Sequence, residues 1–226
     1  MHVPQVIEEI EYPESDGEPM GETDLHRDWI IRILDMLRFR YRGQRVYVAS
    51  DLLIYYEEGI PRHFVVPDNF VVLDCDPGRR RVFKTWEENK IPDVVFEVTS
   101  RSTRTNDESF KPRIYERLGV QEYFLYDPSR EYLRPALQGF RLHDEAFTAI
   151  APDGDGSLTC HTLGIKLRLD NDDLVMSDLQ TGNLLMTEAE AERAAKEDER
   201  AAKEAAESRI VKLQAELDRL RRDRQS

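Results

Sequence analysis

Hydrophobic residues follow a helical rhythm near the start of the chain. The rhythm predicts an amphipathic helix from about Leu25 to Tyr41. Asp24 stands directly before this helix, where an N-cap residue is expected. The repeating apolar positions are Trp29, Ile30, Ile33, Leu34, Leu37 and Tyr41.

Five short runs rich in β-branched and aromatic residues come next, at 45–49, 52–56, 70–74, 94–99 and 122–127. Several are apolar on both faces, which is typical of strands at the centre of a sheet. A helical pattern that ends at Gly119 separates the last two runs. This strand–helix–strand order predicts a parallel crossover. Residues 131–178 are expected to form smaller hairpin strands, including QGFRLH and IKLRLD.

The two ends of the chain differ from this middle part. Residues 1–24 are acidic and contain Pro and Gly, which predicts an extended arm. Residues 187–226 are rich in Ala, Glu, Lys and Arg and favour a helix. The predicted organisation is therefore an arm (1–24), an α/β domain (25–186) and a helical tail (187–226).

The tail also carries an apolar stripe near its end. Ile210, Leu213, Leu217 and Leu220 alternate in steps of three and four, which is the a/d spacing of a coiled coil. Self-association as a coiled coil and a solvated single helix are both consistent with this stripe. A homo-oligomer, such as a dimer, is the expectation.

Charge is unevenly distributed along the chain, whose net charge is −13. Residues 1–24 contain eight acidic and no basic residues, and the tail contains eleven acidic and ten basic ones, which leaves −4 for residues 25–186. A domain of this charge lacks the broad basic footprint of a tight DNA binder. A local basic groove that works together with metal ions stays compatible with it.

Cysteine content and hydropathy indicate a cytoplasmic protein with no membrane partner. Cys75 and Cys160 have no CxxC spacing and are interpreted as buried thiols in a reducing compartment. No apolar run is long enough to cross a bilayer. The segment from Met1 to Glu11 lacks the basic start and apolar stretch of a secretory signal.

Candidate chemistry lies between Pro67 and Tyr126. Asp68 precedes one apolar strand, Glu97 lies inside another, and Lys111 opens the helix that follows. An ionised carboxylate in so apolar a strand is costly to bury unless it is paired or bound to a metal. Two carboxylates can share Mg²⁺, and a nearby lysine can hold a water or stabilise negative charge on phosphorus. Together they are the minimum set for metal-assisted phosphodiester hydrolysis.

Asp93 is a competing carboxylate, because Pro92 and Asp93 form a second PD pair. It shares a strand face with Glu97, but four residues at roughly 3.3 Å each separate the two by about 13 Å. One ion cannot bridge that distance. Asp93 is therefore interpreted as a turn residue at the start of the strand.

The run PDVVFEVTSRSTRTND, followed by a lysine and then by YERLGVQEYFLYDP, resembles the Uma2 family. This family is a branch of the PD-(D/E)XK nuclease superfamily. The resemblance covers roughly residues 22–180, and its specific part is the block from Pro92 to Pro128. It implies an α/β, restriction-endonuclease-like fold in which helices flank a mixed central sheet. It also implies DNA as substrate and Mg²⁺ or Mn²⁺ bound by the motif carboxylates.

The resemblance implies roles for three residues. Asp68 matches the aspartate of the PD motif, and Glu97 matches the first acid of (D/E)XK. Thr99 occupies the place of the motif lysine, and Lys111 is expected to supply the amine instead. Two hypotheses follow. The first is a metal-dependent endonuclease, with Asp68 and Glu97 as metal ligands and Lys111 orienting or activating water. The second is a catalytically weak or inactive nuclease-fold protein that acts as an oligomeric binding module through its tail.

Neighbouring polar residues receive structural interpretations. Glu22 is a candidate third acid for the metal, and His26 is interpreted as a surface or packing residue. Arg101 and Arg104 are interpreted as solvated. Three tyrosines, Tyr115, Tyr123 and Tyr126, have core-like spacing and are expected to pack. The loop residues after the Glu97 strand are interpreted as helix caps; they are Ser100, Ser102, Thr103 and Asp107.

Overall fold

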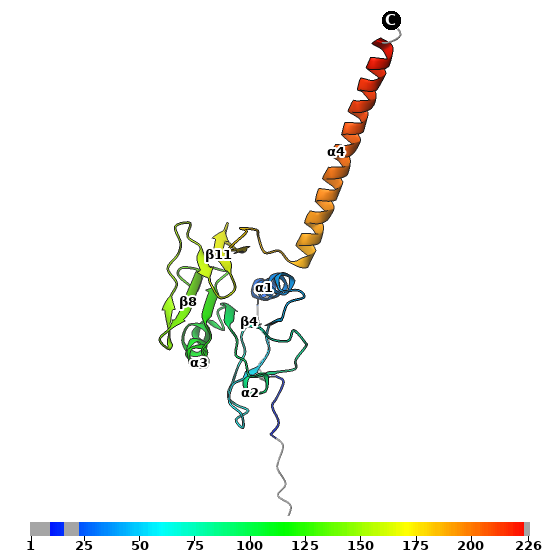
Figure 1. Cartoon of the computed structure of the whole chain (residues 1–226). Coiled ribbons are helices and arrows are strands. Elements are labelled where there is room, and N and C mark those ends of the chain that lie inside the picture. The colour runs from blue at the N-terminus through cyan, green and yellow to red at the C-terminus, as the bar shows by residue number, and fades with distance from the viewer. Residues whose placement is uncertain (1–9, 16–22, 224–226) are drawn as a thin grey trace, which may run out of the picture. The chain divides into compact units, whose positions relative to one another are not determined.

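A computed structural model of the chain describes residues 10–15 and 23–223, with side chains through residue 215 (Figure 1). The chain divides into two units, residues 1–185 and 186–226, which are described separately.

The described part of the first unit is built around a six-stranded mixed sheet. Strands β6 and β7 are parallel, and the other paired neighbours in this sheet are antiparallel. Every residue of β1, β6 and β7 is buried, which confirms the prediction that apolar runs form central strands. The order is β1 (Val46–Ala49), β4 (Asn69–Leu73), β6 (Val94–Val98), β7 (Glu122–Tyr126), β8 (Leu137–His143) and β9 (Ala146–Ala149).

The parallel pair is joined by the predicted crossover. Helix α3 (Lys111–Leu118) connects β6 to β7 and follows a short π-helix, η1 (Asn106–Phe110). It ends at Gly119, whose φ of 86° lies in the left-handed region that glycine adopts without a steric penalty. The sequence pattern therefore identified both the crossover and its end, but not the π-helix.

Helix α1 (Asp24–Arg40) packs its apolar face against the sheet. Its N-cap is Thr23, not Asp24 as predicted. Thr23 has extended backbone, and its hydroxyl accepts a hydrogen bond from the His26 N–H at 3.3 Å. Either side chain can cap a helix, and the backbone angle of Thr23 decides between them.

Two small sheets complete the described part of this unit. The predicted strand at 52–56 is only two residues long, because it pairs with equally short neighbours. The predicted hairpin strands QGFRLH and IKLRLD are present within β8 and β11. One sheet contains β2 (Ile54–Tyr55), β3 (Phe64–Val65) and β5 (Phe83–Lys84), and the other contains β10 (Leu158–Cys160), β11 (Ile165–Asp170) and β12 (Asp173–Asp178); a short helix, α2 (Thr85–Glu88), follows β5.

The described piece of the N-terminal arm, residues 10–15, has no helix or strand and lies against this domain. The Tyr55 hydroxyl donates to the Pro13 carbonyl oxygen at 2.5 Å, and the Tyr12 ring packs on Tyr55 and Trp86. Elsewhere in the domain, Cys75 and Cys160 are buried free thiols, as predicted.

The second unit contains one long helix, α4 (Glu188–Asp223). Thr187 and Glu190 form a reciprocal capping box at its start, with hydrogen bonds of 2.9 and 3.2 Å. Ile210 and Leu213 are 53% and 51% exposed, and the side chains of Leu217 and Leu220 lie outside the described residues. The helix was predicted correctly, whereas coiled-coil self-association stays a prediction.

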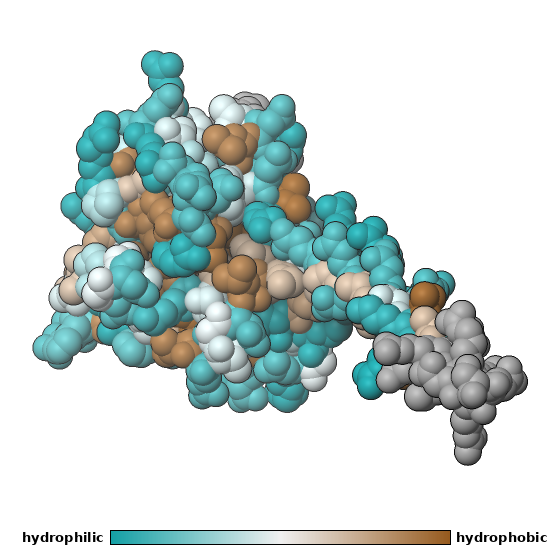
Figure 2. Space-filling model, turned by 90° about the horizontal axis from the view of Figure 1, so that it is seen from above, coloured by the Kyte–Doolittle hydropathy of each residue, from teal (hydrophilic) through white to brown (hydrophobic). Residues whose placement is uncertain are grey.

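Much of the face shown in Figure 2 is hydrophilic. On the face shown in Figure 2, hydrophobic residues form separate groups bordered by hydrophilic ones. Among the described residues, no helix is both long and apolar enough to cross a membrane.

Candidate active site

The alternation of side chains along β6 decides which face of the sheet Glu97 occupies. Phe96 and Val98 belong to the core cluster that contains α1, whereas Val95 belongs to the cluster that contains Tyr115 of α3. Glu97 shares the parity of Val95, so its side chain points toward α3. An acid in this strand therefore lies between the sheet and the crossover helix.

Asp68 and Lys111 are brought to the same face by neighbouring elements. Asp68 comes directly before β4, which is paired with β6, and Lys111 is the first residue of α3. The three residues predicted from the sequence, Asp68, Glu97 and Lys111, are thus gathered in one place.

Glu97 is the centre of this cluster and is only 1% exposed. Its Oε2 accepts hydrogen bonds from the Lys111 ammonium at 2.8 Å and from the backbone N–H of Asp68 at 3.1 Å. Its Oε1 accepts a hydrogen bond from the Tyr115 hydroxyl at 2.6 Å. Tyr115 was interpreted as a packing residue, and the structure adds a polar contact to that role.

Asp68 is tied to the next strand and to α1. Its Oδ2 accepts a hydrogen bond from the Val98 N–H at 2.7 Å. The His26 Nε2 lies 3.7 Å from the same oxygen and also contacts the Val98 carbonyl oxygen. His26 is buried, so the interpretation as a surface or packing residue missed its polar contacts at the site.

Asp107 is a further member that the sequence interpretation missed. It was interpreted as a helix cap in a loop, and that interpretation is wrong, because no side chain caps η1 and Asp107 is fully buried. Its Oδ1 lies 3.1 Å from the Lys111 ammonium. The spacing of four residues between Asp107 and Lys111 was the available signal, since such pairs meet on one helix face. The π-helix is a local irregularity often found at functional sites.

Other predicted candidates lie outside this cluster or contribute little to it. Asp93 lies at the opposite end of β6, where its Oδ2 accepts a hydrogen bond from the Leu73 N–H at 2.7 Å. Thr99 is buried, but its hydroxyl has no hydrogen-bond partner among the described residues. Arg104 pairs with Glu108 at the surface. Glu22 lies outside the described residues.

The remaining tyrosines also make polar contacts. The Tyr123 hydroxyl donates to the backbone carbonyl oxygen of Asp107 at 2.7 Å and so supports η1. The Tyr126 hydroxyl donates to the Asp172 carbonyl oxygen at 3.1 Å. Of the loop residues expected to cap a helix, Ser100 and Thr103 form reciprocal hydrogen bonds where the helical segment before η1 begins. The Ser100 N–H donates to the Thr103 hydroxyl at 3.1 Å and the Thr103 N–H donates to the Ser100 hydroxyl at 3.4 Å, which is the pattern of a capping box.

The electrostatics of the cluster are dominated by an excess of carboxylates. Burial, and then the charge of Glu97, raise the pKa of Asp68 well above its usual value. Burial likewise raises the pKa of Glu97, although the Lys111 ammonium opposes the shift. Burial alone would lower the pKa of Lys111, but Glu97, Asp107 and Asp68 outweigh it and raise that pKa. Lys111 is therefore a cation at neutral pH.

This surplus of buried carboxyl groups suits a divalent cation, whose preferred ligands are oxygens. Asp68, Glu97 and Asp107 face one lysine, and the carboxylate oxygens of Asp107 accept no hydrogen bond from the described residues. Within the described part of the chain, no group of three or more His, Cys, Asp or Glu side chains is placed to hold a metal ion. Mg²⁺ does not require one, because it is commonly held by one or two carboxylates together with water and substrate oxygens.

The mixed sheet, the crossover helix and the buried carboxylate–lysine cluster define an α/β protein with a preformed charged site. Residues 5–169 match the model of the Uma2 family, described as "Putative restriction endonuclease". Because the match spans most of the chain, the protein belongs to the Uma2 family.

No curated protein is similar enough to the chain to count as a relative. A solved structure described as "a putative nuclease belonging to DUF820 from Anabaena variabilis ATCC 29413" is 14% identical, with a TM-score of 0.46 over 64% of this chain and 75% of that one.

Proposed function

We propose that the protein is a Mg²⁺- or Mn²⁺-dependent endonuclease that hydrolyses phosphodiester bonds of DNA. The observation that carries the proposal is the buried cluster in which Glu97 contacts Lys111 at 2.8 Å and the Asp68 N–H at 3.1 Å. Membership of the Uma2 family supports the same reaction class.

Asp68 and Glu97 are the residues that would hold the metal ion. Bound there, the ion would neutralise charge on a phosphate and lower the pKa of a coordinated water. The backbone N–H of Val98 and the Tyr115 hydroxyl hold these two carboxylates in place. A site whose ligands are already oriented loses little free energy to reorganisation when the ion binds.

Lys111 is proposed to act as a cation. Its raised pKa keeps it protonated, so it is suited to donate a hydrogen bond to an attacking water or to a phosphate oxygen. It is poorly suited to remove a proton. Of the two roles expected for Lys111, orienting water is therefore favoured over activating it by deprotonation.

The alternative, an inactive nuclease fold that binds partners through its tail, is not favoured. A protein that only needed a stable core would gain by replacing buried charges with apolar side chains. Here two buried carboxylates, Asp68 and Glu97, and a lysine are held by directed hydrogen bonds, and the carboxylate of Asp107 lies 3.1 Å from the same lysine.

A nicking assay tests the proposed function. Purified full-length protein should convert supercoiled plasmid to nicked or linear DNA with Mg²⁺ or Mn²⁺, and EDTA should stop the reaction because it removes the ion. Ca²⁺ in place of Mg²⁺ serves as a further control. Plasmid that stays supercoiled at all Mg²⁺ and Mn²⁺ concentrations would count against the proposal.

Metal binding should distinguish the two PD aspartates. Asp68→Asn is expected to weaken Mn²⁺ binding at least about 10-fold, because it removes a charged ligand. Asp93→Asn should leave binding nearly unchanged, because Asp93 lies at the far end of β6 and bonds Leu73. Isothermal calorimetry on both variants measures this. Each asparagine retains an oxygen that can accept the backbone hydrogen bond, so both variants should fold. A larger loss from Asp93→Asn would show that the wrong pair was chosen.

A further inference from the structure

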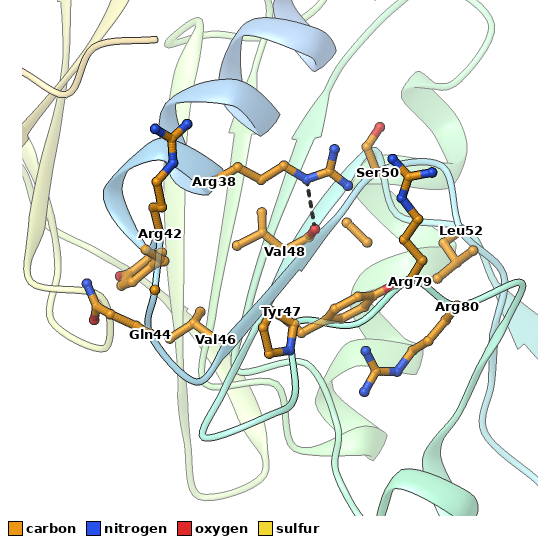
Figure 3. Close-up of a pocket in the computed structure, with 14 residues that line it drawn as sticks. Arg38, Arg42, Gln44, Val46, Tyr47, Val48, Ser50, Leu52, Arg79 and Arg80 are labelled. Carbon is orange, nitrogen blue, oxygen red and sulfur yellow. Dashed lines mark hydrogen bonds between the residues drawn. The ribbon is translucent and has the colours of Figure 1, made fainter. Parts of the chain in front are cut away.

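A groove lined by arginines runs along the free edge of the central sheet. Its volume is about 520 Å³, and none of the described residues that line it is acidic. Arg38, Arg42, Arg79 and Arg80 line it together with Tyr47 and Ser50 (Figure 3). We call these six residues the arginine groove.

The groove is formed by two parts of the chain that are separate in the sequence, residues 38–52 and residues 77–80. Arg38 and Arg42 come from the end of α1 and the turn after it, Tyr47 from β1, and Arg79 from the segment between β4 and β5. In the described sheet β1 pairs with β4 alone, so its other edge faces the groove. Figure 3 shows the arginine side chains arranged around this strand.

Two of the arginines shape the groove. The Arg80 guanidinium forms two hydrogen bonds with Glu88, at 2.5 and 2.8 Å, and lies 4.2 Å from the centre of the Tyr47 ring. Its charge is largely neutralised there. The Arg38 Nε donates to the Val48 carbonyl oxygen at 3.2 Å and so covers part of the strand edge.

The other two arginines have exposed side chains, and the Arg42 guanidinium lies 5.1 Å from the centre of the Phe39 ring. Arg42 and Arg79 are exposed and lie on opposite sides of β1, one after α1 and one in the segment after β4. The chain has a net charge of −13, which already favours solubility. A local group of positive side chains on such a chain therefore indicates an anionic partner. A row of arginines suits a repeating anion such as a phosphodiester backbone.

One end of the groove adjoins the candidate active site. Ala49, which lines the groove, pairs with Phe70 of β4, two residues after Asp68. The next turn makes the same connection, because the Asp51 N–H donates to the Pro67 carbonyl oxygen at 3.2 Å. The groove therefore leads along β1 toward the strand end that carries Asp68.

A second copy of the chain is a weaker candidate for this edge. An exposed strand edge can pair with another strand, but charged side chains along the edge disfavour such pairing. Arg38 already occupies the Val48 carbonyl oxygen that an added strand would use. Like charges from two copies would also meet.

We propose that the arginine groove binds the phosphate backbone of DNA and directs it toward the Asp68–Glu97 site. The proposal rests on the proposed function for its substrate, and its test measures binding separately from cleavage. Arg42 and Arg79 contact phosphates, while Arg80 and Arg38 keep the groove in shape.

The test compares two double variants in a Glu97→Gln chain, which allows binding to be measured without cleavage. The groove pair is Arg42→Gln with Arg79→Gln. The control pair is Arg117→Gln with Arg168→Gln, which removes the same charge from side chains that are 75% and 40% exposed and do not line the groove. Fluorescence anisotropy with a labelled 20-base-pair duplex, read over a salt series, gives the affinities.

The groove pair should bind DNA at least about 10-fold more weakly than the control pair at 0.1 M salt. Each phosphate contact releases counterions from the DNA, and this release favours binding, so losing two contacts weakens it. The negative slope of log K against log salt should become less steep by about 2, which is close to one unit for each lost phosphate contact. Equal affinities for the two pairs, or no duplex binding by the parent Glu97→Gln chain, would overturn the proposal. A change of mass in light scattering for the groove pair alone would also overturn it, because the edge would then hold a second copy.

These outcomes separate the groove from the proposed function. If the groove pair binds weakly but the chain with native Glu97 never cuts plasmid, the groove proposal stands and the nuclease assignment falls. If the native chain cuts plasmid and the groove pair in that background cuts it with unchanged KM, the nuclease assignment stands and the groove proposal falls.

Discussion

Glu97→Gln should reduce the rate of DNA cleavage by at least about 100-fold. The substitution removes a charge that the proposed site uses to hold its metal ion, and metal ions supply several kcal/mol of transition-state stabilisation. Glutamine has nearly the same shape and retains an oxygen that can accept the Tyr115 hydrogen bond. The measurement is the initial rate of plasmid nicking under single-turnover conditions.

A matched substitution tests whether the loss of activity is specific to the carboxylate of Glu97 or follows from removing any nearby acidic charge. Glu108→Gln changes a surface residue next to Asp107 that pairs with Arg104, and it should leave the nicking rate close to that of the parent. Circular dichroism and denaturation should show that both variants are folded. Cleavage by Glu97→Gln at the parental rate would remove Glu97 from the catalytic set.

Glu122→Ala should lower the free energy of unfolding by about 3 kcal/mol or more. Glu122 is buried at the start of β7 and connects the central sheet to the turn between β10 and β11. It accepts hydrogen bonds from Arg141 at 2.8 and 3.0 Å and from the Thr162 N–H at 2.8 Å. Alanine would leave the backbone N–H groups of His161 and Thr162 without this acceptor, which is more costly than losing the bonds alone, whereas Arg141 is 39% exposed and keeps its bond to the Thr159 carbonyl oxygen. Urea denaturation followed by fluorescence measures the loss.

The exposed Glu131 offers the control. Glu131→Ala removes the same side chain from the surface of the same domain and should change the free energy of unfolding by less than about 0.5 kcal/mol. Equal effects of the two substitutions would mean that the Glu122 network contributes nothing specific.

The effect of Glu122 should also depend on pH. Burial on its own raises its pKa, but hydrogen bonds from Cys160, Thr162 and Arg141 outweigh burial and leave the pKa below its ordinary value. An acid whose pKa falls on folding stabilises the protein above its unfolded pKa, near 4.3, and loses that contribution as the pH falls through the folded value. The difference in unfolding free energy between the parent and Glu122→Ala should therefore shrink below about pH 4.

The sequence predicted the central strands and the crossover because their signals are local. Apolar runs buried on both faces, such as those around Val71 and Val95, need no knowledge of their neighbours. Gly119 marks the end of α3 for an equally local reason, since the left-handed conformation is easiest for glycine. The two-residue strands β2, β3 and β5 carry no such periodic signal, and only the partners that they pair with make them strands.

One part of the candidate site, Glu97, was predicted because its signal is also local. Glu97 stood out as an acid in an apolar strand, and its parity with Val95 was readable from the sequence. The strand order and the handedness of the crossover place α3 over this face. Lys111 and Tyr115 meet Glu97 for that reason. Asp68 and Lys111 were candidates from their places before a strand and at the start of a helix, and the resemblance to Uma2 proteins implied their roles beside Glu97.

The sequence by itself determined the central strands, helices α1, α3 and α4, and which of their faces are apolar. Tertiary structure decided which polar residues meet. His26 lies 72 residues before Val98, and no local pattern links them. Asp107 is buried by a single π-helical turn, and the arginine groove exists only because α1, β1 and the segment after β4 come together at one sheet edge. The physical reason is that periodicity reports how a segment divides between core and solvent, whereas contacts between distant segments depend on how the whole chain packs.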